Sequence, residues 1–165
     1  MLRSLTGVGS MIIIIGFDNT GKTTLANRLN RDLLWPVVKS PGPVTYEEQE
    51  AFIKKAKTGY IYERFPLFEE MVYGPILRGR SNFDWEDGNT KRLKNIVLPQ
   101  IIYCRPPREV IFDTLEEREH MEGVIEHNER LLAQFDEIAM KLFAEGWMVQ
   151  VYDYTRPEAY SEILN

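Results

Sequence analysis

Short apolar runs alternate with segments of helical periodicity along most of the chain. The first run, residues 11–15 (MIIII), has no alternating polar positions, a pattern typical of a strand buried on both faces of a parallel sheet. In residues 22–34, three leucines recur at the spacing of one helix face. By the same reasoning we predict further strands at 35–39, 60–63, 100–104 and 147–152, helices at 45–57, 66–74, 91–98, 124–143 and 155–164, and a polar loop at 79–90.

Capping and breaker residues set several of these boundaries. Thr45–Glu48 and Thr155–Glu158 have the spacing of a capping box, which marks the start of a helix. The helix that begins at Pro66 is predicted to end its first part at Gly74-Pro75. Gly146 is the predicted C-terminal cap of the long amphipathic helix before it. The alternation of strands and helices implies parallel strands, right-handed crossovers and helices on both faces of the sheet.

The residues after the first strand match a phosphate-binding motif. Residues 16–23 (GFDNTGKT) fit G-x-x-x-x-G-K-[ST] between a predicted strand and a predicted helix. Its two glycines permit close backbone approaches, and its successive N–H groups can surround an anion at the helix N-terminus. The alternative is a chance match in a glycine-bearing turn. The predicted ATP-binding residues are Gly16, Asn19, Thr20, Gly21, Lys22, Thr23 and Thr24.

Two side chains of this motif carry chemistry of their own. The Lys22 ammonium can follow the β- and γ-phosphates as a catalytic group, and the Thr23 hydroxyl can bind Mg²⁺. The fold class that we predict is therefore α/β, a three-layer P-loop NTPase fold. Its five-stranded parallel sheet has the order 2-3-1-4-5, and ligands are expected at the carboxyl ends of the strands. We expect a single domain over residues 11–165, preceded by a flexible leader at 1–10.

Composition narrows the class of partner. The 165 residues contain 20 Lys and Arg and 25 Asp and Glu, so the net charge is 20 − 25 = −5, which makes a nucleic-acid partner unlikely. Small anionic ligands in a local basic pocket remain compatible with that charge. The single cysteine cannot form an intramolecular disulfide, and the longest aliphatic run is far too short for a membrane span. We expect a cytoplasmic protein without a membrane partner, and leave open whether it forms a homodimer.

Charged residues also stand at the ends of the other strands. Glu63-Arg64 closes the third strand beside the cradle, where the carboxylate can hold Mg²⁺ and the guanidinium can clamp a phosphate during catalysis. The alternative for this pair is a surface ion pair. Lys39 ends the second strand, where a basic residue suits an acceptor that already carries phosphate, although a solvated strand end explains it equally well. A nucleoside acceptor favours a carboxylate there as general base.

Three further groups are candidates for the substrate side. Asp18 lies inside the phosphate loop, where it can accept a hydrogen bond from an acceptor hydroxyl or bond the loop backbone. Phe65 can stack on a base, although aromatic residues at helical spacing belong to the core more often. Residues 105–122 are crowded with charge and read as a mobile lid or as an ordinary solvated surface. A lid would supply a catalytic arginine, for which Arg105 and Arg118 are the candidates and Arg108 lies between them.

The sequence resembles the thymidylate kinase-like group of P-loop nucleotide and deoxynucleoside kinases. Residues 16–24 (GFDNTGKTT) look like the G-x-[DE]-x-x-G-K-[ST]-T loop of that group, and Glu63-Arg64 is similar to its Asp-Arg or Glu-Arg pair. The resemblance implies that Asp18 contacts the 3′-hydroxyl of the acceptor sugar, that the carboxylate of the pair contacts Mg²⁺ and that its arginine contacts phosphate. It also implies a lid at 105–122 and an adenine-side loop at 152–157.

One departure from the group shapes the predicted catalytic set. Asn19 stands where some members carry a catalytic arginine, so the arginine is expected from the lid. The compact size is similar to that of phage-encoded members. The leading hypothesis is an ATP- and Mg²⁺-dependent kinase of deoxynucleoside monophosphates. The alternatives are a deoxynucleoside kinase, a kinase that acts on DNA, and a nucleotide-binding regulatory module without a small acceptor.

Overall fold

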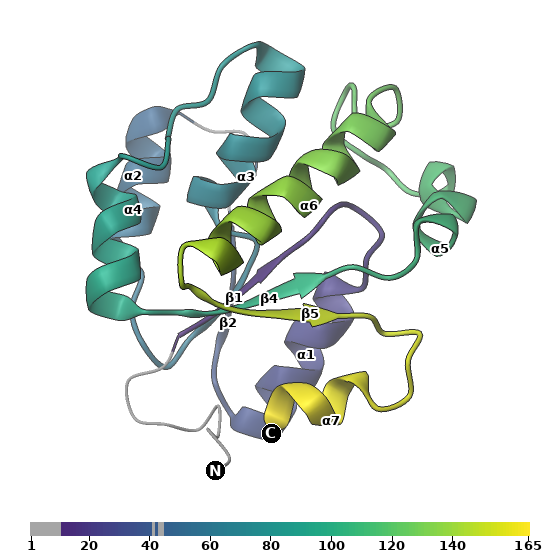
Figure 1. The fold of residues 1–165 in the computed structure, drawn as a ribbon, viewed down its shortest axis with the longest axis horizontal. Coiled ribbons are helices and arrows are strands. Elements are labelled where there is room, and N and C mark those ends of the chain that lie inside the picture. Colours follow the sequence, from purple (N-terminus) through teal and green to yellow (C-terminus); the bar gives the residue numbers. More distant parts are fainter. Residues whose placement is uncertain (1–10, 41, 43–44) are drawn as a thin grey trace.

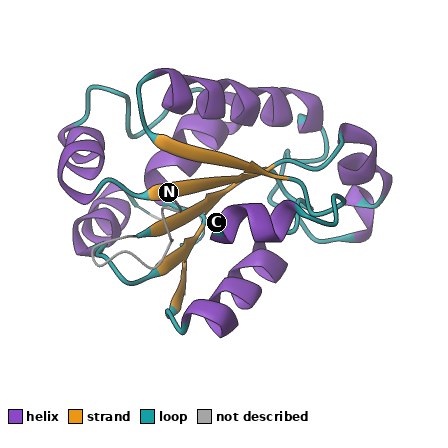
Figure 2. Ribbon diagram, turned by 60° about the horizontal axis from the view of Figure 1, so that its bottom comes forward, coloured by secondary structure: helices purple, strands orange, loops and turns teal. Residues whose placement is uncertain are grey.

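A five-stranded parallel sheet forms the centre of the molecule (Figures 1 and 2). This computed structural model describes residues 11–40, 42 and 45–165, so the leader predicted at 1–10 lies outside the described residues. The strand order is β2-β3-β1-β4-β5, as predicted. The strands are β1 (Ile12–Ile15), β2 (Val37–Lys39), β3 (Ile61–Glu63), β4 (Gln100–Cys104) and β5 (Met148–Tyr152).

Helices cover both faces of this sheet. Successive side chains of β1 point to opposite faces, and all of them are apolar, so each face needs a layer of helices to bury it. Ile13 and Ile15 belong to the larger core with α2 (Tyr46–Lys55), α3 (Pro66–Tyr73) and α6 (Asn128–Ala144). Ile12 and Ile14 belong to the smaller core with α1 (Lys22–Leu33) and α7 (Ala159–Leu164). The continuous apolar pattern of the first strand is thus explained, because both of its faces are buried.

The remaining elements lie at the ends of the sheet or beyond α3. In Figure 1, α5 lies beyond the carboxyl ends of β4 and β5, and α4 lies near the opposite end of β4. The register aligns Ile14 of β1 with Glu63 of β3, so the strand ends meet at one edge. The elements outside the sheet and its two helix layers are the π-helical stretches η1 (Gly74–Arg78) and η2 (Leu93–Val97), the helices α4 (Gly88–Arg92) and α5 (Arg108–Asp113), and the 3₁₀ turn η3 (Leu115–Glu117).

The boundary predicted at Gly74-Pro75 is confirmed, because α3 ends at Tyr73 and the chain continues from Gly74 as the wider η1, where the missing proline N–H is accommodated. Another predicted boundary differs from the structure. The capping box at Thr155–Glu158 does not form, because the Asp153 carboxylate accepts both the backbone N–H and the hydroxyl of Thr155, at 2.9 and 2.7 Å. Helix α7 therefore begins four residues later, at Ala159.

Smaller differences concern the loop at 79–90 and the long helix. Asp87 accepts a hydrogen bond from the Asn89 backbone at 2.8 Å and starts α4 inside the predicted loop. Val124 is buried as its apolar spacing predicted, but α6 begins only at Asn128. The capping box at Thr45–Glu48 is confirmed. Within the described residues, no helix is long and apolar enough to cross a membrane.

Candidate active site

The loop between β1 and α1 has the backbone geometry that its glycines predicted. Gly16 has φ +151°, and a Cβ there would lie 2.7 Å from the Cys104 carbonyl oxygen. Gly21 has φ +86° immediately before α1, and a Cβ there would lie 2.9 Å from the Tyr154 ring. Asn19 is also left-handed, with φ 62°. Side chains at the two glycines are excluded by the adjoining strand β4 and by the segment after β5, respectively.

This loop surrounds a hollow of about 430 Å³, which we call the cradle. Its walls come from the loop itself, the end of β3, the segment after η3 and the residues that follow β5. The lining residues are Asp18, Asn19, Thr20, Gly21, Lys22, Thr23, Thr24, Glu63, Arg64, Arg118, Glu119, His120, Tyr152 and Tyr154.

The Lys22 side chain is buried and folded onto the loop. Its ammonium donates to the Phe17 carbonyl and lies 3.3 Å from the Thr20 hydroxyl oxygen. Burial and the neighbouring positive charge of Arg64 lower the pKa of Lys22 to about 8, against the opposing effect of Asp18 and Glu69. An anion in the cradle would offset both unfavourable effects, so the loop holds a cation that is prepared for a phosphate.

Thr23 and Glu63 form the part of the cradle that suits a metal ion. The Thr23 hydroxyl donates to one Glu63 carboxylate oxygen. The other oxygen, Oε2, is buried without a hydrogen-bond partner among the described residues, and the Lys39 ammonium lies 3.8 Å from it. Hard oxygen ligands beside a phosphate site fit Mg²⁺, which binds through one or two protein oxygens and takes the rest from phosphate and water.

Asp18 lies at the centre of a cluster that the sequence did not reveal. Its Oδ1 accepts hydrogen bonds from Arg64 at 2.9 Å and from the Tyr73 hydroxyl at 3.0 Å, and its Oδ2 lies 2.6 Å from His120 Nδ1. Burial alone would raise the pKa of the Asp18 carboxyl, but the charges of Arg64 and Lys22 and the hydrogen bonds from His120 and Arg64 lower it to about 2. Asp18 is therefore ionised.

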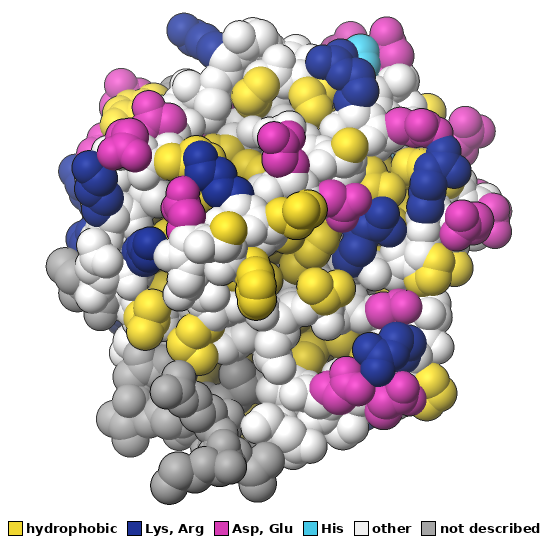
Figure 3. All heavy atoms as spheres, viewed as in Figure 1, with side chains coloured by type: hydrophobic (Ala, Val, Ile, Leu, Met, Phe, Trp, Pro, Cys, Tyr) yellow, Lys and Arg dark blue, Asp and Glu magenta, His cyan; other side chains and the backbone are white. Residues whose placement is uncertain are grey.

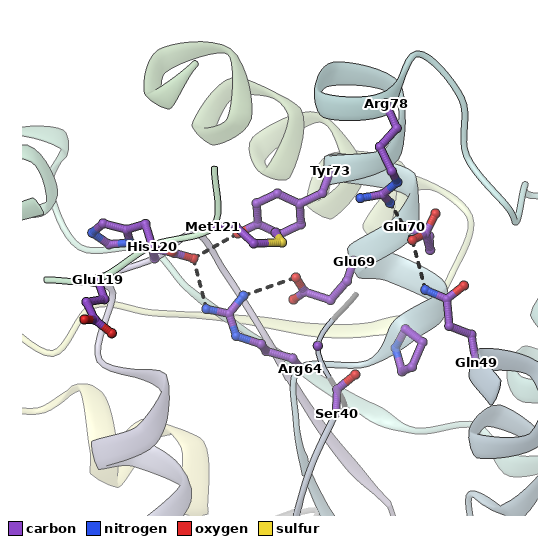
Figure 4. Close-up of a pocket in the computed structure, with 13 residues that line it drawn as sticks. Ser40, Gln49, Arg64, Glu69, Glu70, Tyr73, Arg78, Glu119, His120 and Met121 are labelled. Atoms are coloured by element: carbon purple, nitrogen blue, oxygen red, sulfur yellow. Dashed lines mark hydrogen bonds and ion pairs between the residues drawn. The ribbon is translucent and has the colours of Figure 1, made fainter. Parts of the chain in front are cut away.

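Arg64 is held in a constrained conformation between two carboxylates. Its backbone is left-handed, with φ 68°, which is uncommon for a residue other than glycine. Its guanidinium bonds Asp18 and, at 3.2 Å, Glu69 (Figure 4). Burial disfavours the charge, but Glu69, Tyr73 and Asp18 raise the pKa of Arg64 above its ordinary value, so it stays cationic.

A second hollow of about 460 Å³, which we call the acceptor hollow, lies on the other side of this cluster. Figure 4 shows side chains from α2, α3, η1 and the segment 119–121 around it. The two hollows share Asp18, Arg64, Glu119 and His120 as a common wall. The remaining lining residues of the acceptor hollow are Ser40, Gly42, Gln49, Pro66, Glu69, Glu70, Tyr73, Arg78 and Met121.

The far end of the acceptor hollow is a hydrogen-bonded polar network. Glu70 accepts from Gln49 at 2.9 Å and from Arg78 at 2.5 Å (Figure 4), and the Asn82 side chain donates to Gln49 at 2.9 Å. Each partner holds the next in a fixed orientation. Glu69 adds a buried oxygen, Oε1, that has no hydrogen-bond partner in the described part of the chain.

Not every predicted site residue lies in these hollows. Arg118 lines the cradle and Lys39 lies beside it, at Glu63. Arg105 does not line either hollow, because its guanidinium is paired with Asp136 of α6 at 2.8 Å. Phe65 does not line them either. Its side chain is fully buried in the larger core, edge-on to Tyr62.

Sequence reasoning missed two contributors to the cluster. In the sequence, His120 is one residue of the charged segment 105–122, and Tyr73 is one residue of the helix predicted at 66–74. The one available signal for His120 was a histidine within a segment rich in carboxylates. Asn19, the residue in the place of an arginine, donates to the Ile111 carbonyl at 2.9 Å and to the Thr114 hydroxyl at 2.8 Å, and so ties the loop to α5.

Comparison with known proteins identifies the fold. No family model and no curated protein matches the sequence. The structure is similar to that of the YorR protein from Bacillus subtilis in complex with phosphorylated GDP, with a TM-score of 0.69, 18% identity and 93% of each chain covered. It is also similar to deoxyadenosine kinase from M. mycoides with products dCMP and a flexible dCDP bound, with a TM-score of 0.61 and 21% identity over 94% of this chain and 96% of that one. The chain thus has the P-loop kinase fold, while the thymidylate kinase-like branch stays a prediction.

Proposed function

We propose that the chain is a phosphotransferase that moves the γ-phosphate of ATP to a deoxynucleoside monophosphate. The observation that carries this proposal is the common wall of the two hollows. A triphosphate in the cradle and a small acceptor in the acceptor hollow would meet at Asp18, Arg64 and His120. The fold shared with a deoxyadenosine kinase supports the same reaction class.

The residues of the cradle have separate roles in this reaction. The loop N–H groups and Lys22 bind the β- and γ-phosphates. Arg64 and Arg118 add positive charge that stabilises the negative charge of the transferred phosphoryl group. Mg²⁺ held by Thr23 and Glu63 would neutralise charge on the same two phosphates. Transfer of this kind depends on positioning and charge stabilisation more than on covalent chemistry of the protein.

The acceptor side supports a nucleotide acceptor through the residues at the wall. Asp18, as an ionised carboxylate, accepts a hydrogen bond from a sugar hydroxyl, while Arg64 faces both hollows and can bind an acceptor phosphate. Lys39 lies at the end of β2, where a nucleoside acceptor would favour a carboxylate as general base. A basic residue at this position suits an acceptor that already carries phosphate. A small acceptor is favoured over nucleic acid, since acidic and basic side chains alternate across the face in Figure 3. Location in the cytoplasm stays a prediction.

A deoxynucleoside is the second candidate acceptor, favoured by the acids of the acceptor hollow. Glu69 and Glu70 line it together with Asp18 and Glu119, against the two guanidinium groups of Arg64 and Arg78. An uncharged acceptor meets less repulsion from this surface than a nucleotide does.

An ADP-release assay with Mg²⁺-ATP and each deoxynucleoside monophosphate and nucleoside in turn tests the proposal. Acceptor-dependent turnover with monophosphates supports it, and turnover with nucleosides alone supports the second candidate. Slow ATP hydrolysis that no acceptor stimulates would indicate a regulatory module. Transfer of labelled phosphate to an oligonucleotide would indicate a kinase that acts on DNA.

A further inference from the structure

His120 makes two hydrogen bonds that place opposite demands on a neutral ring. Its side chain is only 5% exposed. Nδ1 lies 2.6 Å from Asp18 Oδ2, and Nε2 lies 2.5 Å from the Leu115 carbonyl oxygen. Both partners are acceptors, because a carbonyl oxygen never donates and the Asp18 carboxyl, with a pKa of about 2, is ionised at neutral pH.

A neutral imidazole carries hydrogen on only one of its two nitrogens. In that form, one of the two contacts would bring a nitrogen lone pair against an oxygen lone pair at hydrogen-bond distance. The doubly protonated ring donates in both directions and also carries the charge that complements Asp18. The geometry around His120 is therefore that of an imidazolium.

The contacts of His120 join two parts of the chain. Asp18 belongs to the phosphate loop, whereas Leu115 belongs to the segment 114–123, which forms part of the wall over both hollows. Asn19 attaches the start of this segment to the same loop through the Thr114 hydroxyl. The Asn19 attachment does not depend on pH, while the His120 attachment requires a proton.

We propose that His120 is a positioning residue of the transfer reaction, which closes the segment 114–123 onto Asp18 only in its doubly protonated form. Loss of one proton would release the segment and free Asp18 Oδ2, so the acceptor side loses its fixed geometry as the pH rises. The role in transfer rests on the proposed function, but the state of the ring does not.

Several charged groups face this contact, and the pKa of one of them, Lys22, is about 8. Arg64 stays cationic, and burial raises the pKa of Tyr73 well above its ordinary value, so neither changes charge near neutral pH. Lys22, with a pKa of about 8, also loses charge as the pH rises. The charged and titratable groups around His120 are Asp18 and Lys22 of the loop and α1, Arg64 after β3, Glu69 and Tyr73 of α3, and Arg118 and Glu119 of its own segment.

The state of the ring can be measured without any substrate. The chain contains two histidines, and the other, His127, has a side chain that is 29% exposed and lies 3.9 Å from Glu126. In the His127→Gln variant, ¹⁵N-labelled histidine therefore gives one ring to follow by NMR. We expect both nitrogens of His120 to carry hydrogen at pH 6.5. A lone-pair nitrogen signal at that pH would overturn the proposal, whether or not the protein proves to be a kinase.

The pH profile of kcat/KM for the acceptor tests the functional part. We expect His120→Gln to lower kcat/KM roughly tenfold to a hundredfold at pH 6.5, the range for a hydrogen bond between charged groups. It should also remove the fall in kcat/KM that the wild type shows as the pH rises from 6.5. His127→Gln, the matched control, should keep that fall. Bound ATP raises the pKa of Lys22 above 8, so loss of charge at Lys22 lies at higher pH and is the same in both variants.

A permanently charged side chain sharpens this test. His120→Arg keeps positive charge and several donors at every pH, so it should recover part of the activity that His120→Gln loses and show no fall below pH 8. A profile in His120→Gln that is parallel to the wild type would overturn the proposal. If His120→Arg unfolds at a lower temperature than His120→Gln, the NMR measurement and the His120→Gln profile decide.

Discussion

The cradle and the acceptor hollow are alike in size but are built in different ways. The floor of the cradle is one consecutive stretch of chain, the loop between β1 and α1 with Lys22 and Thr23, and residues from the end of β3, the segment after η3 and the segment after β5 complete its walls. The acceptor hollow consists of side chains from the phosphate loop, α2, α3, η1 and the segment 119–121, joined by Asp18, Arg64 and the Glu70 network. A backbone site is fixed by one local fold. A side-chain site depends on how distant elements pack.

This difference implies different sensitivities. Single changes in the cradle should affect turnover with every acceptor, because the donor phosphates bind there. Changes in the acceptor hollow should affect one acceptor more than another and leave the affinity for ATP unchanged. The wall that the two hollows share is the place where this separation can be tested.

The largest effect is expected at Lys22. Lys22→Ala removes the only positively charged side chain of the loop 16–23, and we expect kcat to fall by roughly three orders of magnitude for all acceptors. Arg31→Ala, on the same helix with a side chain that is 73% exposed, is the control and should keep wild-type turnover. Steady-state ADP release measures both, and unchanged turnover in Lys22→Ala would contradict the assignment of the cradle.

A smaller and more selective effect is expected at Asp18. Asp18→Asn keeps the shape of the side chain but loses the charge that Arg64 and His120 share. We expect kcat/KM for the acceptor to fall roughly a hundredfold while KM for ATP changes little. Asp113→Asn, at the exposed end of α5, is the matched control. Equal losses for acceptor and ATP would show that the two hollows are not separate in function.

The same contrast explains how much of the site could be predicted from the sequence. The motif at 16–23 is contiguous, the strand before it is an unbroken apolar run and the helix after it has helical periodicity, so its geometry followed from local rules. The parallel arrangement of the strands followed from the alternation of strands and helices, and the order 2-3-1-4-5 followed from the P-loop fold that the motif indicates. These features depend on residues that are neighbours in the chain.

The acceptor side could not be predicted in the same way because its partners are distant in sequence. His120 and Asp18 are 102 positions apart, and the ion pair that removes Arg105 from the site is formed with Asp136, 31 positions away. Phe65 follows the predicted strand end but turns into the core between Tyr62 and Phe68. No spacing in the sequence distinguishes these placements from the alternatives, because packing of separate helices decides them.

Acid should weaken the wall before it affects the cradle backbone. The pKa of Asp18 falls from 3.8 to about 2 on folding, so its contribution to stability is present above pH 4 and is lost as the pH falls towards 2. This contribution is about 2 kcal/mol in the free energy of unfolding. Urea unfolding of wild type and Asp18→Asn should therefore differ more at pH 5 than at pH 2.5, and Asp113→Asn should follow the wild type. A constant difference across this range would contradict the low pKa.

The smallest effect concerns the proton on Lys22. Its pKa is about 8, mainly because the side chain is buried and lies near Arg64. A bound triphosphate favours the charged form and raises that pKa, so binding near pH 8 must take up protons, and affinity must fall as the pH rises above 8. We expect roughly half a proton taken up per nucleotide at pH 8, measured by titration calorimetry in buffers of different ionisation enthalpy.

Lys22→Arg distinguishes this proton from those of the nucleotide. Arginine is charged at every pH used, so proton uptake that belongs to residue 22 disappears in the variant, while uptake by the phosphate groups remains. The difference between the two proteins thus isolates one side chain of the cradle. Equal uptake by both would mean that the ammonium is already fully charged before the nucleotide binds. In that case burial would not disfavour its charge, and the cradle would resemble the acceptor hollow, where Arg64 keeps its charge between carboxylates.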